Sequence, residues 1–472
     1  MGGSWLARTD GRSIEGVGLD SRAVRGGEVF FAVRGERFDG HDFLDDAATR
    51  GAGMIVVEDP DAARSFGEAF PGVGVVRVAD TRKALGLLAA AYRRTLESTR
   101  VVAITGSAGK TTTARLTRGL LATRLRGRAP EKSFNNEIGV PLTVLAAKPG
   151  DQFLVCELGM NAPGEIARLA KIVEPDVAVI TNIGRAHAGG VGGIEGVARE
   201  KASLLSYLRA GGCAVTPAGE PLLADYLKPV PHVVSFGTDG SADLRLTAVE
   251  HTAGGAGLTF EVNGRKRFAL PMIGKHNALN ALAAIAAARR LGLDDAAIEA
   301  GLASAAAPEM RLARRAVGPV EVFDDTYNAS PESMLAAIDT FYELTGSASR
   351  RVLVLGDMLE LGESSAAAHD EVGRRIAELG EPGLLVTVGA EALHVAERVT
   401  RSFPRARVLI LSELDDEQAR RVANRVSSGD AVLVKGSRRL GLERVVRAIR
   451  VRAEAREMEP SGEVGAARGP GG

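Results

Sequence analysis

The stretch Val101-Val-Ala-Ile-Thr-Gly106-Ser-Ala-Gly109-Lys110-Thr111-Thr112-Thr113 decides how the middle of this chain folds. Its apolar, β-branched start predicts a buried strand, and residues 111–125 predict a helix after a tight glycine-containing loop. Backbone N–H groups at the start of such a helix are unpaired and can bind phosphate, and glycine lets the backbone approach closely. Lys110 can reach the outer phosphates, and the Thr111 hydroxyl can bind Mg²⁺. The segment therefore predicts a nucleoside triphosphate site.

The loop in this segment is shorter than the full eight-residue phosphate-loop pattern. That pattern would place its first glycine at Ile104, whereas this chain has only Gly106-x-x-Gly109-Lys110-Thr111. The alternative is an ordinary glycine–lysine turn without a ligand. The strand that precedes the loop favours the phosphate site.

The bulk composition is that of an ordinary globular protein. The chain has 472 residues, 45% of them hydrophobic and 25% charged, and its formal net charge is zero. We therefore expect no general attraction to nucleic acid and no membrane insertion, because no apolar run is long enough to span a bilayer. Cys156 and Cys213 make no disulfide framework, and the N-terminus has no signal pattern. These features predict a cytoplasmic protein.

Alternating strand and helix patterns predict an α/β protein of three domains. We expect a small α/β domain over residues 1–98 and a central domain with a parallel sheet and the phosphate loop over 99–313. A doubly wound, Rossmann-like domain follows over 314–456, with a hinge from Arg314 onward. The later strands of the central domain look like a meander. The tail, 457–472, lacks an apolar pattern and is predicted to be disordered.

Polar residues follow several predicted central strands. Gly106, Glu157 and Asn182 each lie just past a strand end. Ligands bind beyond the carboxyl ends of parallel strands, so we expect the three residues to share one edge. A carboxylate such as Glu157 suits the hard cation Mg²⁺. The alternative for Glu157 is a helix cap or a surface acid.

Two further residues of the central domain could serve the same site. His187 also follows a strand, although a lone histidine is more often structural. Lys201 lies on the next predicted helix, and a lysine that captures CO₂ becomes an anionic oxygen ligand. Neutralising its amine costs roughly 4–5 kcal/mol at pH 7 unless burial or a neighbouring cation lowers the pKa. The residues alone favour a solvated lysine.

Three other segments place polar groups at helix starts or turns. In Lys275-His276-Asn277, the asparagine reads as a helix cap, or together with Asn280 as a contact to adenine or phosphate. The segment from Asp324 and Asp325 to Pro331 is a turn that could bind ribose or Mg²⁺. Lys435-Gly-Ser437-Arg438 offers donors for an anion, or is a solvated basic turn.

Taken together, these motifs resemble the Mur ligase family of peptidoglycan precursor synthesis, and within it the member that adds a dipeptide. The resemblance covers nearly the whole chain except the tail. The segments that carry the resemblance are Asp20-Ser21-Arg22, Ser133-Phe-Asn135-Asn136-Glu-Ile138-Gly139, Asp325-Thr-Tyr327-Asn328-Ala-Ser330-Pro331 and Gly356-Asp357-Met358-Leu-Glu360-Leu-Gly362. The Asp-Asn-Pro-Arg signature of the diamino-acid-adding member is absent.

The resemblance implies an ADP-forming ligase. It would use ATP and Mg²⁺ to join D-alanyl-D-alanine to UDP-N-acetylmuramoyl-tripeptide through an acyl phosphate, and we expect a monomer. It implies that Lys110, Lys201 and His187 are catalytic and that Lys201 is carbamylated. The implied magnesium ligands are Thr111, Glu157, His187 and Lys201. The implied nucleotide contacts are Gly106, Ser107, Ala108, Gly109, Lys110, Thr111, Thr112, Asn277, Asn280, Arg311 and Asp325. The implied substrate contacts are Ser21, Arg22, Asn135, Asn136, Tyr327, Asn328, Ser437 and Arg438.

The chain departs from the family pattern at two places. Ala202 and Ser203 follow Lys201 where the family often has Gly-Glu, and Ala188 and Gly189 follow His187 instead of a larger residue and an acid. These departures concern details of the metal shell. Two other ligases of this architecture stay open, a diamino-acid-adding enzyme and a folylpolyglutamate-type enzyme. A nucleotide-dependent switch or binding module is the alternative of another class.

Overall fold

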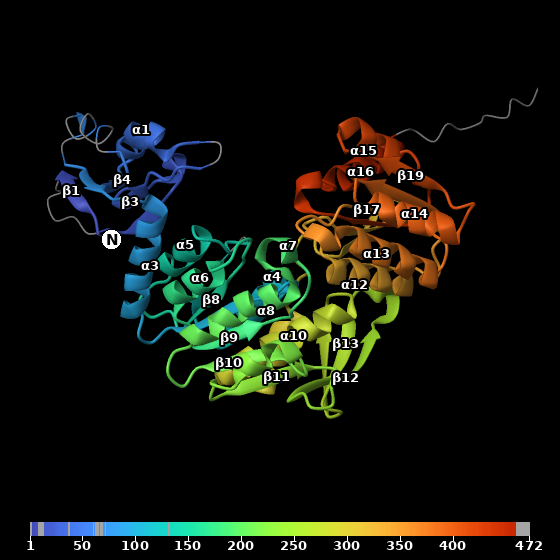
Figure 1. The fold of residues 1–472 in the computed structure, drawn as a ribbon, viewed down its shortest axis with the longest axis horizontal. Helices are drawn as coiled ribbons and strands as arrows, with labels where there is room; N and C mark the ends of the chain where they lie inside the picture. Colours follow the sequence, from blue (N-terminus) through green and yellow to red (C-terminus); the bar gives the residue numbers. More distant parts are fainter. Residues whose placement is uncertain are drawn as a thin grey trace, which may run out of the picture. The chain divides into compact units, whose positions relative to one another are not determined.

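The computed structural model describes residues 2–7, 14–35, 38–59, 61, 66, 69, 70, 72–130 and 133–458. They form two compact units. The first comprises the described residues within Met1–Glu250, Gly257–Met272 and His276–Ala306, and the second comprises those within His251–Ala256, Ile273–Lys275 and Ala307–Gly472. The three sheets of the two units are drawn in Figure 1.

The beginning of the first unit is a small five-stranded sheet with the order β1-β5-β4-β3-β2. Its strands are β1 (Ser4–Ala7), β2 (Gly16–Gly18), β3 (Glu28–Phe31), β4 (Met54–Val57) and β5 (Gly74–Arg77). Its helices are η1 (Ser21–Ala23), η2 (Gly40–Phe43), α1 (Leu44–Thr49) and α3 (Thr81–Thr95). Alternate residues of β3 enter different cores: Phe30 packs with α1 residues on one face, and Phe31 packs with α3 residues on the other.

The rest of the first unit is built on a nine-stranded sheet with the order β14-β13-β12-β11-β10-β9-β6-β8-β7. Its strands are β6 (Arg100–Thr105), β7 (Gly127–Arg128), β8 (Phe153–Glu157), β9 (Val177–Ile180), β10 (Cys213–Pro217), β11 (Val233–Gly237), β12 (Leu244–His251), β13 (Leu258–Val262) and β14 (Lys266–Leu270). Its helices are α4 (Lys110–Leu121), α5 (Gly139–Leu145), α6 (Glu165–Val173), α7 (Ala188–Val191), α8 (Gly193–Ala202), η3 (Ser203–Tyr207), η4 (Pro221–Leu223), α9 (Ala224–Leu227), α10 (Lys275–Arg290) and α11 (Asp295–Ala303). The short helix η5 (Ala253–Gly255), between β12 and β13, belongs to the second unit.

The central strands β6, β8 and β9 are parallel neighbours whose residues are almost all buried. Continuous apolar runs are typical of parallel strands covered on both faces. The helix predicted over residues 111–125 begins at Lys110 and ends at Leu121. The meander predicted for the later strands is confirmed for β13 and β14, which pair antiparallel. The earlier pairs, β10 with β11 and β11 with β12, are parallel.

The second unit has a six-stranded sheet with the order β15-β16-β20-β17-β18-β19. Its strands are β15 (Ala313–Val317), β16 (Val320–Asp325), β17 (Arg350–Gly356), β18 (Leu384–Val388), β19 (Val408–Leu411) and β20 (Asp430–Lys435). Its helices are α12 (Pro331–Leu344), η6 (Gly362–Ser364), α13 (Ser365–Leu379), α14 (Leu393–Ser402), α15 (Asp416–Ala423), η7 (Arg438–Leu440) and α16 (Glu443–Met458).

Helices cover both faces of this sheet. Along β17, Leu353 and Leu355 pack with α12, α13 and α14, while Val352 and Val354 pack with α15 and α16. All the strands except β15 pair in parallel. The predicted fold class, with a small α/β domain, a central parallel-sheet domain and a doubly wound domain, is therefore confirmed.

The sequence predicts a hinge at the start of this unit and a disordered tail at its end. Arg314, predicted to begin a hinge, instead lies in strand β15, where its side chain bonds Glu321 and the carbonyls of Gly254 and Gly255. The predicted tail lies outside the described residues, apart from its first two positions at the end of α16. The domain boundaries at 98/99 and 313/314 stay predictions.

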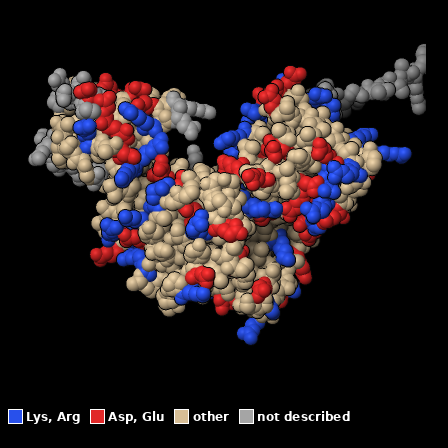
Figure 2. All heavy atoms as spheres, in the orientation of Figure 1, with Lys and Arg blue, Asp and Glu red and all other residues tan. Residues whose placement is uncertain are grey.

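The surface shows no single dominant charge. Figure 2 shows acidic and basic side chains intermixed over the visible face, in keeping with the formal net charge of zero. Among the described residues, no helix is both long and apolar enough to cross a membrane.

Candidate functional site

The loop between β6 and α4 has a backbone that only glycine allows. Gly106 has a φ of 151° and Gly109 a φ of 81°, both in the region that L side chains avoid. A Cβ atom on Gly109 would lie 2.2 Å from Asn280 Oδ1, and one on Gly106 would lie 1.8 Å from Thr181 Oγ1. The two glycines therefore let the loop fold tightly in front of the first turn of α4.

The segment after β9 holds this loop in place. Asn182 Oδ1 accepts a hydrogen bond from Ala108 N at 2.9 Å, and Thr181 Oγ1 donates to Ala108 O at 2.5 Å. The Ser107 hydroxyl donates to Gly184 O and accepts from Gly184 N, both at 2.9 Å. Asn182 was expected at this edge from its place after a strand. Thr181 was not, because nothing in its local sequence distinguishes it.

Lys110 opens α4 and curls back over the loop, where its Nζ donates to Gly106 O at 2.7 Å. Thr111 and Thr112 follow it in the first turn of the helix and are buried. The first-turn N–H groups of a helix make its amino end attractive to anions. A lysine amine over this end adds positive charge where a phosphate would bind.

The Glu157 carboxylate lies beside the start of α4. It accepts hydrogen bonds from Thr111 Oγ1 at 2.8 Å, Ser133 Oγ at 2.9 Å and Asn135 Nδ2 at 3.0 Å. Its side chain is buried at the end of β8, so the alternatives of a helix cap or a surface acid are wrong. Asn135, predicted to contact substrate, is thus next to a predicted metal ligand. Ser133, in the same segment of the sequence, was not predicted as a site residue.

Lys201 is almost completely buried in the last turn of α8, with 1% of its surface exposed. The alternative of a solvated lysine is therefore wrong. Burial, followed by the nearby positive charge of Lys110, holds the pKa of Lys201 well below its usual value, while Glu200 acts in the opposite direction. The Glu200 carboxylate also accepts from the backbone N–H groups of Gly164 and Ile166, both at 2.8 Å, at the start of α6.

His187 immediately precedes α7 and has a φ of 63°, which is uncommon for a residue with a side chain. Helix α7 lies against the segment after β8, since a Cβ on Gly190 would be 2.9 Å from Asn161 O. The strands β9, β6 and β8 are parallel neighbours in that order. Lys110, Glu157 and His187 therefore follow the carboxyl ends of three adjacent strands at one edge of the sheet.

The asparagines of α10 lie next to the phosphate loop. Asn280 Oδ1 accepts from Thr113 Oγ1 at 3.4 Å, and Asn280 Nδ2 donates to Asn277 Oδ1 at 3.2 Å. Asn277 is the third residue of α10, which begins at Lys275, so its reading as a helix cap is wrong. Both asparagines are buried.

Three predicted substrate residues of the first unit have local partners. Ser21 Oγ donates to Asp46 Oδ2 at 3.0 Å, and Arg22 forms an exposed ion pair with Asp20 at 2.8 Å. Asn136 Oδ1 accepts from Gly139 N at 2.9 Å and so holds the start of α5. Of the three residues, Arg22 and Asn136 are exposed and Ser21 is buried.

The second unit gathers its predicted residues at the carboxyl edge of its own sheet. Lys435 Nζ pairs with Asp325 Oδ2 at 2.7 Å and donates to Asn328 O at 3.0 Å. The Lys435 side chain is only 2% exposed, so a solvated basic turn is not what the structure has at this residue. The Arg311 guanidinium lies 4.2 Å from the centre of the Tyr327 ring.

Ser437 and Arg438 follow Lys435 at the same edge. Ser437 Oγ accepts from Leu359 N at 2.9 Å, which joins this loop to the one after β17. Arg438 is half-exposed and pairs with Glu443 at 3.3 Å. These donors and the Asp325–Lys435 pair belong to the second unit, whereas the phosphate loop belongs to the first.

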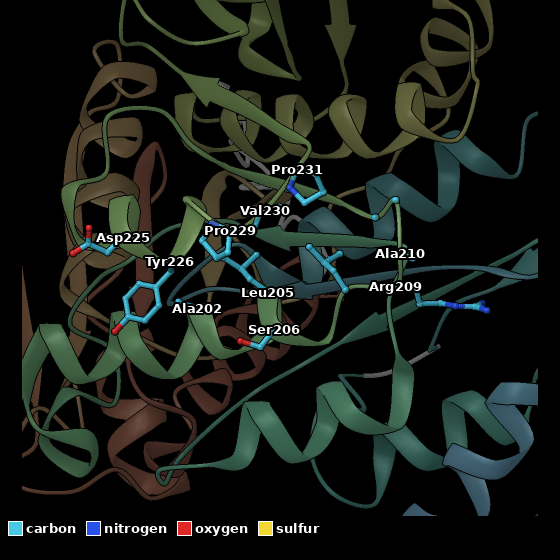
Figure 3. A pocket seen from close by; sticks show the side chains of 13 residues that line it. Ala202, Leu205, Ser206, Arg209, Ala210, Asp225, Tyr226, Pro229, Val230 and Pro231 are labelled. Carbon is cyan, nitrogen blue, oxygen red and sulfur yellow. The ribbon is translucent and has the colours of Figure 1, made fainter.

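A cavity of about 500 Å³ lies elsewhere in the first unit (Figure 3). It is lined by residues before β10, such as Gly212, and before β11, such as Pro231, together with Leu205 of η3. These positions are at the amino ends of the parallel strands, whereas Gly106 and Glu157 follow carboxyl ends. The cavity is therefore at the opposite edge from the phosphate loop. Figure 3 shows apolar side chains, including Pro229 and Val230, around it.

Three family models match the chain. The "Mur ligase family, catalytic domain" model matches residues 13–93, the "Mur ligase middle domain" model matches 104–288, and the "Mur ligase, glutamate ligase domain" model matches 310–438. A relative from Bacillus subtilis, a UDP-N-acetylmuramoyl-tripeptide–D-alanyl-D-alanine ligase, is 36% identical over 92% of this chain and 93% of its own length.

Two solved structures are similar over most of the chain. A MurF from Acinetobacter baumannii has a TM-score of 0.80 and 31% identity over 92% of this chain and 93% of its own. The MurF ligase of Thermotoga maritima, solved in complex with ADP, has a TM-score of 0.78 and 30% identity over 95% of this chain and 100% of its own.

Proposed function

Because this chain belongs to the Mur ligase family, we propose that it is an ATP-dependent, ADP-forming ligase of peptidoglycan precursor synthesis. It joins D-alanyl-D-alanine to UDP-N-acetylmuramoyl-tripeptide, as the names of its relatives state for those proteins. The observation that carries the proposal is the grouping of Lys110, Thr111 and the buried Glu157 at one loop. We propose further that the protein is cytoplasmic and monomeric.

The phosphate loop suits ATP. The amino end of α4 and the Lys110 amine supply positive charge for the β- and γ-phosphates. Gly106 to Thr112 would surround the phosphates, and the relative from Thermotoga maritima was solved with ADP. Asn277 and Asn280 lie next to this loop and would contact the adenine side. Arg311 and Asp325 of the second unit would contribute nucleotide contacts as well.

The residues around Glu157 also suit Mg²⁺. Thr111 Oγ1 is 2.8 Å from a carboxylate oxygen of Glu157, and hydroxyl and carboxylate oxygens are the ligands that Mg²⁺ prefers. No group of three or more His, Cys, Asp or Glu side chains arranged to hold a metal occurs in the described part of the chain. In this proposal Thr111, Glu157 and His187 would hold the ion together with phosphate oxygens. When bound, Mg²⁺ supplies charge that stabilises the transferring phosphoryl group.

Lys201 is a candidate for carbamylation. The reaction of its neutral amine with CO₂ releases one proton and leaves an anionic carbamate. Burial and Lys110 favour the neutral amine that this reaction needs. A carbamate at Lys201 would then offset the charge of Lys110 and provide oxygen ligands. Such ligands are fewer in this chain, because the residues after Lys201 and His187 lack the acids that the family often has there.

The proposed reaction has two steps. The γ-phosphoryl group of ATP moves to the terminal carboxylate of the tripeptide, and the dipeptide amine then displaces phosphate from the acyl phosphate. Lys110 screens the repulsion between carboxylate and triphosphate. Ser21, Arg22, Asn135 and Asn136 would bind the UDP-linked peptide. The residues of the second unit that would bind the dipeptide are Tyr327, Asn328, Ser437 and Arg438.

The test is phosphate release by the purified chain with ATP, Mg²⁺ and UDP-N-acetylmuramoyl-tripeptide. We expect release only when D-alanyl-D-alanine is also present, with a peptide-bonded product seen by mass spectrometry. Turnover with a diamino acid in place of the dipeptide would favour the diamino-acid-adding enzyme. ATP hydrolysis that neither co-substrate affects would favour a nucleotide-dependent switch and overturn the proposal.

A further inference from the structure

The loop between β17 and α13 is held by hydrogen bonds to neighbouring segments and by buried side chains. Asp357 N donates to Val388 O at 3.0 Å, and Asp357 Oδ1 accepts from Ala392 N at 2.7 Å. Met358 and Leu361 are buried in the core beneath the loop. The loop therefore has fixed anchors on both sides of Glu360.

A buried histidine forms one of these anchors. His369 on α13 has no exposed surface, and its Nε2 accepts from Met358 N at 3.0 Å. Its Nδ1 lies 2.8 Å from Ser365 O. A carbonyl can only accept, so Nδ1 carries the proton and Nε2 is the free acceptor of a neutral ring. Burial lowers the pKa of His369 and favours this neutral form.

The charged groups around His369 act in both directions. The Ser365 carbonyl, Asp357 and Glu391 favour the protonated ring, while His394 disfavours it. Burial remains the largest influence. The acceptor at Nε2 is therefore available to Met358 at neutral pH.

The loop after β20 is hydrogen-bonded to the loop after β17. Leu359 N donates to Ser437 Oγ at 2.9 Å, and Ser437 N donates to Asp357 O at 3.0 Å. The backbone N–H groups of Asp357, Met358 and Leu359 all have defined acceptors, one after another. Since β17 and β20 are parallel neighbours, both loops lie at the carboxyl edge, where ligands of doubly wound sheets bind.

Glu360 follows directly after these three fixed residues. It is exposed and has a φ of 66°, in the left-handed region where a residue with a side chain is strained. Strain of this kind persists only where the surroundings impose it, and the anchors on both sides do so. The anchors therefore fix the backbone from which the Glu360 side chain extends into solvent.

We propose that His369 positions this loop so that the Glu360 carboxylate receives the positively charged amino group of the incoming dipeptide. This inference rests on the proposed function, because it concerns the second substrate of that reaction. A zwitterionic dipeptide needs an anion for its amino group and a cation for its carboxylate. Glu360, after β17, supplies the negative charge, and the half-exposed Arg438, after the adjacent strand β20, supplies the positive charge. His369 acts through the loop and is a positioning residue.

The first experiment measures KM separately for ATP, the UDP-linked tripeptide and D-alanyl-D-alanine. In Glu360→Gln, the dipeptide KM should rise about tenfold or more, because a charge-assisted hydrogen bond is lost, while the other two KM values stay within about twofold. Glu363→Gln is the matched control, an exposed acid three residues away in the same loop, and its dipeptide KM should not change. A dipeptide KM that is unchanged in Glu360→Gln would overturn the proposal.

The second experiment replaces the histidine. His369→Phe keeps a ring but removes the acceptor for Met358 N, and it should raise the dipeptide KM as Glu360→Gln does. In His369→Gln, a side-chain oxygen can accept the same hydrogen bond and should restore most of the affinity. Equal increases of all three KM values in His369→Phe would indicate a merely structural histidine. If His369→Phe fails to fold, Glu360→Gln against Glu363→Gln decides the proposal.

A ligand without the positive charge gives an independent readout. N-acetyl-D-alanyl-D-alanine should inhibit the wild type at least tenfold more weakly than the dipeptide binds, and this difference should shrink in Glu360→Gln. A difference of the same size in both proteins would overturn the proposal. Wild-type protein with no turnover of the dipeptide would overturn the proposed function and this inference together, whereas normal turnover with an unchanged Glu360→Gln would overturn this inference alone.

Discussion

Replacing Gly109 by alanine should damage the phosphate loop more than the same change at another left-handed glycine. At a φ of 81°, a Cβ costs about 1–2 kcal/mol in backbone strain alone. The new atom would also lie 2.2 Å from Asn280 Oδ1, so the Asn280 side chain must move. That movement breaks the buried contacts of Asn280 with Thr113 and Asn277 and costs a further ~1–3 kcal/mol.

Gly292 is the matched control. Its φ is 90°, but nothing lies within 4 Å of the position that a Cβ would occupy. Gly292→Ala should therefore show the strain alone, about 1–2 kcal/mol. The total for Gly109→Ala is about 2–5 kcal/mol, which should lower Tm by roughly 4–20 °C at about 2–4 °C per kcal/mol in a large domain.

The assay is thermal unfolding of Gly109→Ala, Gly292→Ala and Gly109→Ala/Asn280→Ala. The double variant removes the carboxamide with which the new Cβ collides. It should be more stable than the sum of the two single losses predicts, because neighbouring residues are not additive. Equal Tm values for Gly109→Ala and Gly292→Ala would refute the reasoning, as would strict additivity in the double variant.

The remaining predictions concern charged and titrating side chains. Lys110→Ala should lower kcat by about 10²–10³-fold or more, because it removes a cation from the phosphate loop, and wild-type turnover would contradict the phosphate site. Lys201→Ala should lose most activity and regain part of it when a short-chain carboxylic acid is added, and no recovery would weaken the carbamate assignment. Asp325→Asn should cost the second unit about 3–5 kcal/mol in urea unfolding, because it leaves Lys435 buried without its ion-pair partner, and a loss below 1 kcal/mol would contradict that pairing. The pKa of His369 in the folded state is lowered from 6.5, so the native state binds fewer protons than the unfolded state just below that pH. The free energy of unfolding should therefore fall as the pH drops through about 6.5, with a smaller slope in His369→Phe. Identical slopes in the two proteins would contradict the neutral buried ring.

The segment around Gly106 to Thr111 correctly predicted a tight loop between a strand and a helix, because the short motif and the strand before it are local features. The alternating strand and helix pattern likewise predicted the parallel strands of the second unit, whereas the antiparallel edge strand β15 was not predicted. The helix after Gly109 was predicted to end four residues too late, since its end at Leu121 has no glycine or proline directly after it. The sequence did not predict the direction in which β10, β11 and β12 pair, because strand direction depends on how the connecting segments cross the sheet.

By itself, the sequence determined that this chain is an α/β protein with a phosphate loop followed by a doubly wound domain, because these features arise from residues close together in the chain. Tertiary structure decided which side chains are buried and what they contact. Lys201 looks like any helical lysine in the sequence, yet the fold buries it beside Lys110 and lowers its pKa. Lys435 and Asp325 are 110 positions apart and pair only because β16 and β20 are neighbours. Burial and charge pairing across the chain are set by packing, which no local pattern records.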